Sequence, residues 1–252
     1  YFMSKIEKKL AAQEMKYSVL MSVYYKEAPG YFKVSLDSML NQTLLPDQIV
    51  LVKDGPLNEK LDSIINEYVE TYSQIFTIVP LEENMGLGKA LDEGLKYCKN
   101  ELVARMDTDD ISLPERCELQ IQAFKNDPEL SILGTVIDEF YNDPSYIVSS
   151  RNVPTKHEEI VKFIRRRSPF NHPTVMFKKS EVIRCGGYGK LRRKQDLDLF
   201  SRMMNSDCKA ANIDQSLVLF RSNEDNFKRR KSWSYCKSYI EVQYAIWKRG
   251  HC

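Results

Sequence analysis

Hydrophobic and polar positions follow two different periods along the first half of the chain. Four short apolar runs have the length and β-branched content of buried strands: Tyr17–Val23, Gln48–Val52, Ile75–Val79 and Glu101–Met106. Three segments between them repeat their apolar residues at helical spacing: Tyr31–Leu40, Leu57–Tyr72 and Leu87–Cys98. Strands that alternate with helices of this length indicate βαβ units. The pattern therefore predicts an α/β fold with a mostly parallel sheet flanked by helices.

The second half of the chain has a less regular pattern. Strands are expected at Ser131–Ile137, Tyr146–Val148, Thr174–Phe177 and Leu217–Phe220, with a tight loop at Gly186–Gly189. Helices are expected at Pro114–Phe124, Glu158–Arg166, Asp196–Met204 and Ser232–Lys248. Since there is no internal repeat, we expect one domain at residues 17–222 with a mixed C-terminal extension of its sheet. Residues 1–16 would form an N-terminal extension, and residues 223–252 a basic, aromatic C-terminal helix.

Polar side chains follow three of the predicted strands. Tyr25 and Glu27 come after the first strand, Asp54 after the second, and Asp107 and Asp109 after the fourth. Ligands of parallel sheets bind at the carboxyl ends of the strands, so these residues should face one crevice. Taken alone, Asp54 could equally be an ordinary β-turn aspartate.

The strongest local signal is the acidic turn Asp107-Thr108-Asp109-Asp110. Three carboxylates in four residues repel one another, and a fold tolerates this mainly when a cation lies among them. Carboxylate oxygens suit Mg²⁺ or Mn²⁺, which complete their shells with phosphate oxygens and water. The alternative is a solvent loop or a helix cap, with Ser112 and Glu115 forming a capping box.

Two further residues are candidates for chemistry. Asp196 falls where a helix is expected to begin, and the partial positive charge there favours the ionised carboxylate that a general base needs. Its alternative role is a helix cap. His172 precedes a predicted strand and could contact phosphate or complete a metal shell, or it could be a structural hydrogen-bonding residue.

Composition narrows the class of protein. Hydrophobic residues make up 42% and charged residues 29% of the 252 residues, as in ordinary soluble domains. No apolar run reaches the roughly 18–20 residues of a membrane helix, and the N-terminal residues lack the apolar core of a signal peptide. The six cysteines show no zinc spacing, which favours reduced thiols. We therefore expect a cytoplasmic protein.

Charge is distributed unevenly along the chain. Residues 1–150 hold 14 Lys and Arg against 25 Asp and Glu, whereas residues 151–252 hold 23 against 10. The basic half contains three basic runs and several aromatic residues: Arg165–Arg167, Arg192–Lys194, Lys228–Lys231, Trp233, Tyr235, Tyr239 and Trp247. This composition predicts peripheral contact with an anionic membrane surface. Two solvated faces of different charge are the alternative.

Several familiar motifs are absent. The chain has no Gly-x-x-x-x-Gly-Lys-Ser/Thr loop, no Gly-x-Gly-x-x-Gly after the first strand and no Gly-x-Ser-x-Gly. A P-loop ATPase, a dinucleotide dehydrogenase and a serine hydrolase are therefore excluded.

Taken in order, the motifs resemble those of family 2 glycosyltransferases with the GT-A fold. The matching stretches are Ser18–Glu27, Ile49–Gly55, Asn84–Ala90, Met106–Asp110 with Leu113–Arg116, and Gln195–Leu199. His172–Phe177 and Gly186–Tyr188 are similar to those of bacterial members that build capsular, exopolysaccharide and O-antigen chains. The resemblance covers roughly residues 17–222, with a nucleotide-binding half at 17–112 and an acceptor-binding half at 113–222.

The resemblance implies a role for each matching residue. Tyr25 and Glu27 would hold the nucleotide base, Asp54 the uracil or ribose, Lys89 the nucleotide and Asp107 the ribose. Asp109 would bind Mn²⁺ or Mg²⁺ at the diphosphate, while His172 or Arg221 could assist there. Asp196 would deprotonate the acceptor hydroxyl.

The activity that the resemblance implies is inverting transfer of one sugar from a nucleotide-sugar, with UDP favoured. The expected acceptor is a saccharide linked to polyprenyl diphosphate at the inner face of the cell membrane. Two departures from the family pattern are Lys53 before Asp54 and Gln195 before Asp196, and the Gln-x-x-Arg-Trp motif of processive members is absent.

Two other functions remain open from the residues alone. A sugar-1-phosphate nucleotidyltransferase also uses an α/β sheet and Mg²⁺, but its glycine-rich phosphate loop after the first strand is missing. A basic nucleic-acid-binding module would not need the acidic first half, and no nucleic-acid-binding signature is present. We therefore expect no nucleic acid partner.

Overall fold

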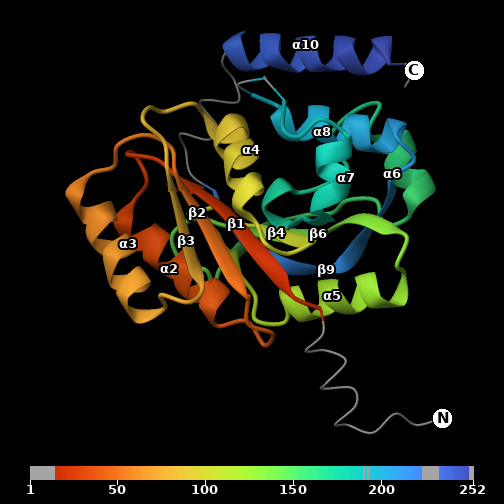
Figure 1. Ribbon diagram of the computed structural model, residues 1–252. Helices are drawn as coiled ribbons and strands as arrows, with labels where there is room; N and C mark the ends of the chain where they lie inside the picture. Colours follow the sequence, from red (N-terminus) through yellow and green to blue (C-terminus); the bar gives the residue numbers. More distant parts are fainter. Residues whose placement is uncertain (1–14, 190, 192, 223–232, 250–252) are drawn as a thin grey trace, which may run out of the picture.

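The computed structural model describes residues 15–189, 191, 193–222 and 233–249 (Figure 1). Four parallel strands form the first part of the sheet in the order β3-β2-β1-β4. Their bounds are Tyr17–Val23 for β1, Gln48–Lys53 for β2, Phe76–Pro80 for β3 and Leu102–Arg105 for β4. The predicted parallel sheet is thus confirmed.

The second part of the sheet is mixed, as expected. It continues from β4 through β8, β6 and β9 to β5, and β7 pairs with the outer part of β6. The bounds are Ile111–Ser112 for β5, Leu130–Phe140 for β6, Ile147–Arg151 for β7, Met176–Lys178 for β8 and Lys209–Arg221 for β9. β8 is antiparallel to both β4 and β6, whereas β6 and β9 run parallel.

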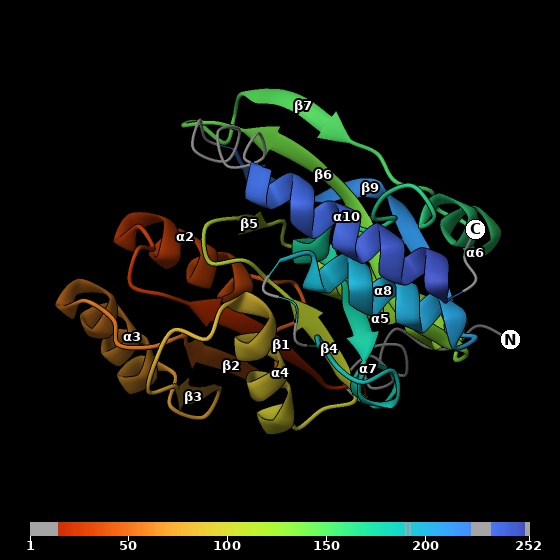
Figure 2. The same cartoon turned by 90° about the horizontal axis from the view of Figure 1, so that it is seen from above.

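Helices cover both faces of the sheet (Figures 1 and 2). One face carries α2 (Pro29–Leu40), α3 (Glu59–Thr71) and α5 (Arg116–Asn126). The other carries α4 (Leu87–Tyr97), α6 (His157–Phe163), α7 (Lys179–Arg184) and α8 (Gln195–Asn205). Because both faces of β1, β2 and β4 are buried, these strands have continuous apolar sequences instead of alternating ones.

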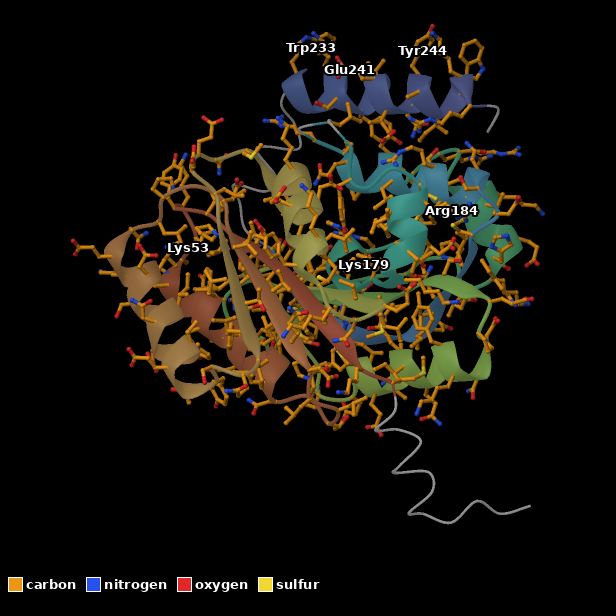
Figure 3. The ribbon with its side chains drawn as sticks, viewed as in Figure 1. Lys53, Lys179, Arg184, Trp233, Glu241 and Tyr244 are labelled. Carbon is orange, nitrogen blue, oxygen red and sulfur yellow. The ribbon has the colours of Figure 1, made fainter. Side chains whose placement is uncertain are left out.

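The last helix, α10 (Trp233–Lys248), lies across α8, outside the helical layer (Figures 1 and 2). Val242 and Ile246 are buried and belong to the same apolar cluster as the core of α8. Trp233 and Tyr244 point away from the rest of the molecule (Figure 3) and are 79% and 54% exposed. The helix therefore has one packed face and one open face.

Several sequence predictions need correction. The expected strand Thr174–Phe177 begins only at Met176, because His172–Thr174 form a 3₁₀ turn. The helix expected from Pro114 begins at Arg116. The prediction of a Ser112–Glu115 capping box is wrong. Ser112 belongs to β5, and its hydroxyl accepts a hydrogen bond from the Gln42 side chain.

Two elements were not predicted, namely β5 and α7, and β9 begins eight residues before the expected strand. The predicted tight loop is confirmed by positive φ angles at all three of its glycines. The run Lys228–Lys231 and residue Arg192 lie outside the described residues. In the part of the chain that is described, no helix has both the length and the apolar character needed to cross a bilayer.

Candidate active site

Loops from the ends of β1, β2 and β4 meet at the carboxyl edge of the sheet. Asp54, after β2, accepts hydrogen bonds from the backbone N–H groups of Met85 (2.7 Å) and Gly86 (3.1 Å). Gly55 has φ +84°, and a Cβ there would lie 2.6 Å from the Asn84 nitrogen, so only glycine allows the loops after β2 and β3 to touch. Asp54 thus fixes the loop that leads into α4, and its predicted contact with uracil or ribose stays a prediction.

The acidic turn after β4 lies against the loop after β1. Thr108 donates a hydrogen bond of 2.6 Å to the Glu27 carboxylate, which also accepts from the Ala28 N–H at 2.9 Å. The carbonyl of Asp107 accepts from the Ser35 hydroxyl of α2 at 2.7 Å. Residues of two separate strand ends are therefore brought together, as the sequence predicts.

Negative charge is concentrated at this turn. Burial, followed by the charges of Asp107 and Glu27, raises the pKa of Asp109 to about 7. Burial and the charge of Asp109 raise the pKa of Asp110 well above its ordinary value, and the Asp110 Oδ2 atom has no hydrogen-bond partner. The carboxylates at this turn thus outnumber the cationic side chains near them.

This environment fits a divalent cation with few protein ligands. Among the described residues, no group of three or more His, Cys, Asp or Glu side chains is arranged as a complete metal site. Mg²⁺ commonly binds through one or two carboxylates together with substrate phosphates. Asp109 and its neighbouring carboxylates can supply that small number of oxygen ligands.

Two arginines from different strands support the turn. Arg105 is fully buried at the end of β4 and pairs with the Asp107 carboxylate, while its Nε and Nη1 atoms have no hydrogen-bond partner. Arg221, at the end of β9, donates from Nε to the Asp109 carbonyl (2.9 Å) and from its backbone N–H to Asp110 (2.8 Å). The role of Arg105 was missed because the residue lies inside an apolar run.

Arg221 is held by aromatic stacking as well as by hydrogen bonds. Its guanidinium carbon lies 3.8 Å from the ring centre of Tyr31 and 4.5 Å from that of Phe140. Its hydrogen bonds to Asp109 and Asp110 stabilise the acidic turn. The predicted contact of Arg221 with a diphosphate remains a prediction.

His172 lies in the 3₁₀ turn before β8 and contacts two aromatic side chains. Its Nε2 is 3.1 Å from the Tyr188 hydroxyl, and its ring packs edge-on against Tyr188 and Phe200. Burial and the nearby Arg105 charge lower the pKa of His172 to about 4, and the charges of both Asp196 and Asp107 also act on it. The imidazole is therefore neutral near pH 7 and electrostatically linked to both parts of the site.

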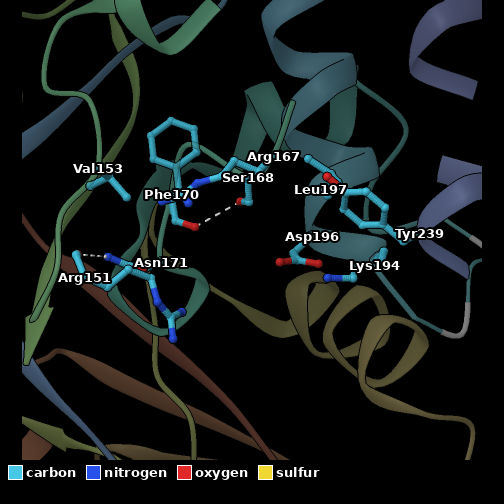
Figure 4. Close-up of a pocket in the computed structure, with 10 residues that line it drawn as sticks. All are labelled: Arg151, Val153, Arg167, Ser168, Phe170, Asn171, Lys194, Asp196, Leu197 and Tyr239. Carbon is cyan, nitrogen blue, oxygen red and sulfur yellow. Dashed lines mark hydrogen bonds between the residues drawn. The ribbon is translucent and has the colours of Figure 1, made fainter. Parts of the chain in front are cut away.

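Asp196 occupies the first turn of α8 and lines a cavity of about 290 Å³ (Figure 4). Asp196 and Lys194 form one side in this view, and Arg151, Phe170 and Asn171 form the other. Gln195 is buried and its side chain packs on Gly88 of α4, where a Cβ would come within 2.9 Å of the Gln195 Cγ. The absence of a side chain at Gly88 lets the start of α8 approach α4.

Two predicted donor-binding residues lie at the surface. Tyr25 is 51% exposed, stacks edge-on with Tyr24 and has Lys26 over its ring. Lys89 is exposed on the first turn of α4. Both can reach a ligand from the solvent side, and their roles in nucleotide binding stay predictions.

The fold is that of GT-A glycosyltransferases. TarS of S. aureus, solved in complex with UDP-GlcNAc, matches with a TM-score of 0.68 and 17% identity over 90% of this chain and 65% of that chain. A mannosyltransferase of Pyrobaculum calidifontis, solved with GDP-Man and Mn²⁺, gives a TM-score of 0.65 and 16% identity, covering 89% of this chain and 66% of that one. This chain spans about two thirds of the length of these neighbours, and 43% of another TarS chain.

Sequence comparison identifies the family. Residues 18–198 match the family model described as Glycosyl transferase family 2. An amylovoran biosynthesis glycosyltransferase of Erwinia amylovora is 39% identical over 90% of this chain and 84% of its own length. A UDP-Gal:alpha-D-GlcNAc-diphosphoundecaprenol beta-1,3-galactosyltransferase of Escherichia coli is 36% identical over 94% of this chain and 85% of its own. The chain belongs to glycosyltransferase family 2.

Family membership decides between the enzyme classes that the residues alone left open. The chain is a glycosyltransferase with relatives in exopolysaccharide and O-antigen biosynthesis. The sugar-1-phosphate nucleotidyltransferase and the nucleic-acid-binding module are therefore not supported.

Proposed function

We propose that this protein transfers a single sugar from a UDP-sugar to a hydroxyl of a saccharide linked to polyprenyl diphosphate, with inversion at the anomeric carbon. The observation that carries the proposal is the acidic turn at the carboxyl edge of the sheet, which bonds to Glu27 through Thr108 and holds a buried Asp110 oxygen with no hydrogen-bond partner. The names of the Escherichia coli relative and of the UDP-GlcNAc complex support the donor and acceptor classes.

In this mechanism Asp109 is the main ligand of Mn²⁺ or Mg²⁺, and Asp107 contacts the donor ribose. A divalent cation held there would supply Lewis-acid stabilisation of the negative charge on the diphosphate. Glu27 and Arg221 hold the acidic turn in place through Thr108 and the Asp109 carbonyl, so its carboxylates are positioned before the donor arrives.

Asp196 accepts the proton of the acceptor hydroxyl while that oxygen attacks the anomeric carbon. Asp196 lies in the first turn of α8 and lines the cavity, where an acceptor hydroxyl can approach its carboxylate. In the proposed in-line displacement the attack comes from the side of the anomeric carbon opposite the departing diphosphate. A single displacement of this kind inverts the anomeric configuration.

The decisive experiment is a screen of nucleotide-sugars for Mn²⁺-dependent hydrolysis or transfer, with calorimetric titration of UDP. We expect UDP to bind with Mn²⁺ and to bind much more weakly in EDTA. Product analysis by NMR would establish the anomeric configuration. UDP binding that is equally weak with and without Mn²⁺ would contradict the proposed donor site.

Contact with an anionic membrane forms a second part of the proposal. Four large exposed side chains share the open face of α10: Trp233, Ile240, Tyr244 and Trp247, which are 79%, 61%, 54% and 56% exposed. Their spacing of seven, four and three residues keeps them within one stripe of the helix. Lys248 lies on the same helix with its ammonium 4.9 Å from the Tyr244 ring centre.

Aromatic residues next to basic ones favour the interface of an anionic bilayer. We expect the protein to sediment with phosphatidylglycerol vesicles at low salt but not with phosphatidylcholine vesicles. Replacing Trp233 and Trp247 by Ala should weaken this binding. The matched aromatic control is Tyr97→Ala, since Tyr97 is exposed at the end of α4. Val242 is unsuitable because it is buried in the packed face of α10. Equal binding by both variants would contradict the proposed membrane face.

A further inference from the structure

The cavity beside Asp196 is rich in positive charge. Among the described residues that line it, Arg151, Arg167 and Lys194 are cationic and Asp196 is the acid. Arg151 is partly offset by an ion pair with Glu139 of β6. Even with Glu139 included, the cations outnumber the carboxylates, in contrast to the acidic turn.

Each of these cations rests on an aromatic ring. The Arg167 guanidinium lies 4.9 Å from the ring centre of Phe163, and the Lys194 ammonium lies 5.3 Å from that of Tyr239. Arg151 lies 5.4 Å from the ring centre of Phe220. Stacking of this kind restricts long flexible side chains, so less conformational entropy is lost when they bind an anion.

The cavity also joins two distant parts of the chain. Tyr239 of α10 forms part of its wall and donates a hydrogen bond from its hydroxyl to the Arg166 carbonyl. Gln243, one turn further along α10, donates to the same carbonyl. Helix α10 therefore carries the open face and also forms part of the cavity wall. A membrane that contacts α10 would lie close to the cavity.

We propose that this cavity binds the diphosphate ester of the acceptor, with Arg167 and Lys194 as the main contacts and Arg151 as a third. This inference rests on the proposed function and adds the residues that recognise the acceptor. The volume of about 290 Å³ is near the lower end of the roughly 300–1,000 Å³ of ligand sites, which suits a head group whose lipid chain extends outside. Guanidinium and ammonium groups are the usual partners of phosphate.

The proposal assigns the donor diphosphate and the acceptor diphosphate to two different sites of the enzyme. The donor diphosphate requires a divalent cation, because the turn that receives it is acidic. The acceptor diphosphate requires none, because the cavity that receives it is basic. Binding in the absence of metal ions therefore distinguishes the two sites.

The test is calorimetric titration of the full chain with geranyl diphosphate in EDTA, with geraniol as the uncharged probe. We expect geranyl diphosphate to bind and geraniol to bind far more weakly. Arg167→Gln and Lys194→Gln should each raise the dissociation constant about tenfold, since each removes a charge-assisted contact. The control is Arg165→Gln, which makes the same change in the same basic run at an exposed residue outside the cavity lining.

The outcomes are distinct from those for the proposed function. The Arg167→Gln and Lys194→Gln variants should keep the Mn²⁺-dependent UDP binding and the melting temperature of the wild type. If Arg165→Gln weakens geranyl diphosphate as much as Arg167→Gln, attraction to a basic surface explains the binding and the proposal is overturned. Failure of geranyl diphosphate to bind a protein that does bind UDP with Mn²⁺ would also overturn it, while the donor site would stand.

Discussion

Replacement of Gly88 by Ala tests whether the contact between α4 and α8 positions Asp196, the proposed catalytic base. A Cβ at this residue would lie 2.9 Å from the Gln195 Cγ, 3.0 Å from the Gln195 Cβ and 3.4 Å from the Leu191 carbonyl oxygen. Ordinary contacts between carbon atoms are about 3.5–4.0 Å. The start of α8 must therefore move by roughly 0.5–1 Å, because the Gln195 Cβ is attached directly to its backbone.

Such a movement should affect catalysis more than stability. Overpacking of a buried contact costs about 1–3 kcal/mol, whereas Ala in place of Gly in a helix gains up to about 1 kcal/mol. A displacement of about 1 Å in a reacting group can cost about 100-fold in rate. We expect kcat to fall roughly 10–100-fold, with a loss of at most about 2 kcal/mol in the free energy of unfolding.

The assay is steady-state transfer together with chemical unfolding and UDP titration. Gly30→Ala is the matched control, since Gly30 is also the second residue of its helix and a Cβ there meets no atom within 4 Å. It should keep the wild-type kcat. Combining Gly88→Ala with Gln195→Ala should recover part of the lost rate, because the Cγ that is closest to the new methyl group is removed.

A wild-type kcat in Gly88→Ala would refute this account of how α8 is positioned. So would an equal loss of UDP affinity, because that result would mean that the loop after β3 had moved instead of α8.

Three further predictions concern single carboxylates and His172. Asp196→Asn should lower kcat by about 10²–10⁴-fold with little change in UDP binding, as measured by transfer rates and calorimetry; an unchanged kcat would remove the general-base role. Asp109→Asn should raise the free energy of unfolding at pH 8 in EDTA by at least about 1 kcal/mol, because it removes a buried negative charge whose pKa is about 7, and should abolish stabilisation by Mn²⁺ with UDP. The pKa of His172 is lowered to about 4, so between pH 6.5 and pH 4 the unfolded chain binds a proton that the folded protein does not. The free energy of unfolding therefore falls as the pH decreases through that range. His172→Gln should lack this contribution of about 3 kcal/mol, and parallel pH profiles of unfolding for the two proteins would contradict it.

The regular part of the fold could be predicted from the sequence because its strands are buried on both faces. β1, β2 and β4 have short apolar sequences, and their ends were placed within one or two residues. β5 has only two residues and depends on pairing with β9, a contact that local sequence does not encode. The early part of β9 contains Asn212, Asp214 and Gln215, so its pairing with β6 overrides a polar sequence.

The candidate site was predicted less evenly. The acidic turn and Asp196 have local signatures, but the cavity beside Asp196 gathers residues from β7, the loop before η1, the start of α8 and α10. The sequence suggested that Arg167 and Lys194 belong to membrane-facing basic runs, whereas the structure places both in the cavity lining. A contact between segments so far apart has no periodic signal along the chain.

The charges around His172 explain how the acidic turn and Asp196 can function in one crevice. The charges of Asp107, in the acidic turn, and of Asp196, at the start of α8, both act on His172. The lowered pKa of His172 keeps its ring neutral, and the fully buried Arg105 provides the positive charge next to Asp107 instead. Arg105 pairs with Asp107, whereas Arg151, Arg167 and Lys194 line the cavity beside Asp196, so each part of the site has its own cations. Because the pKa of His172 is lowered to about 4, the ring adds no positive charge to either part of the site near pH 7.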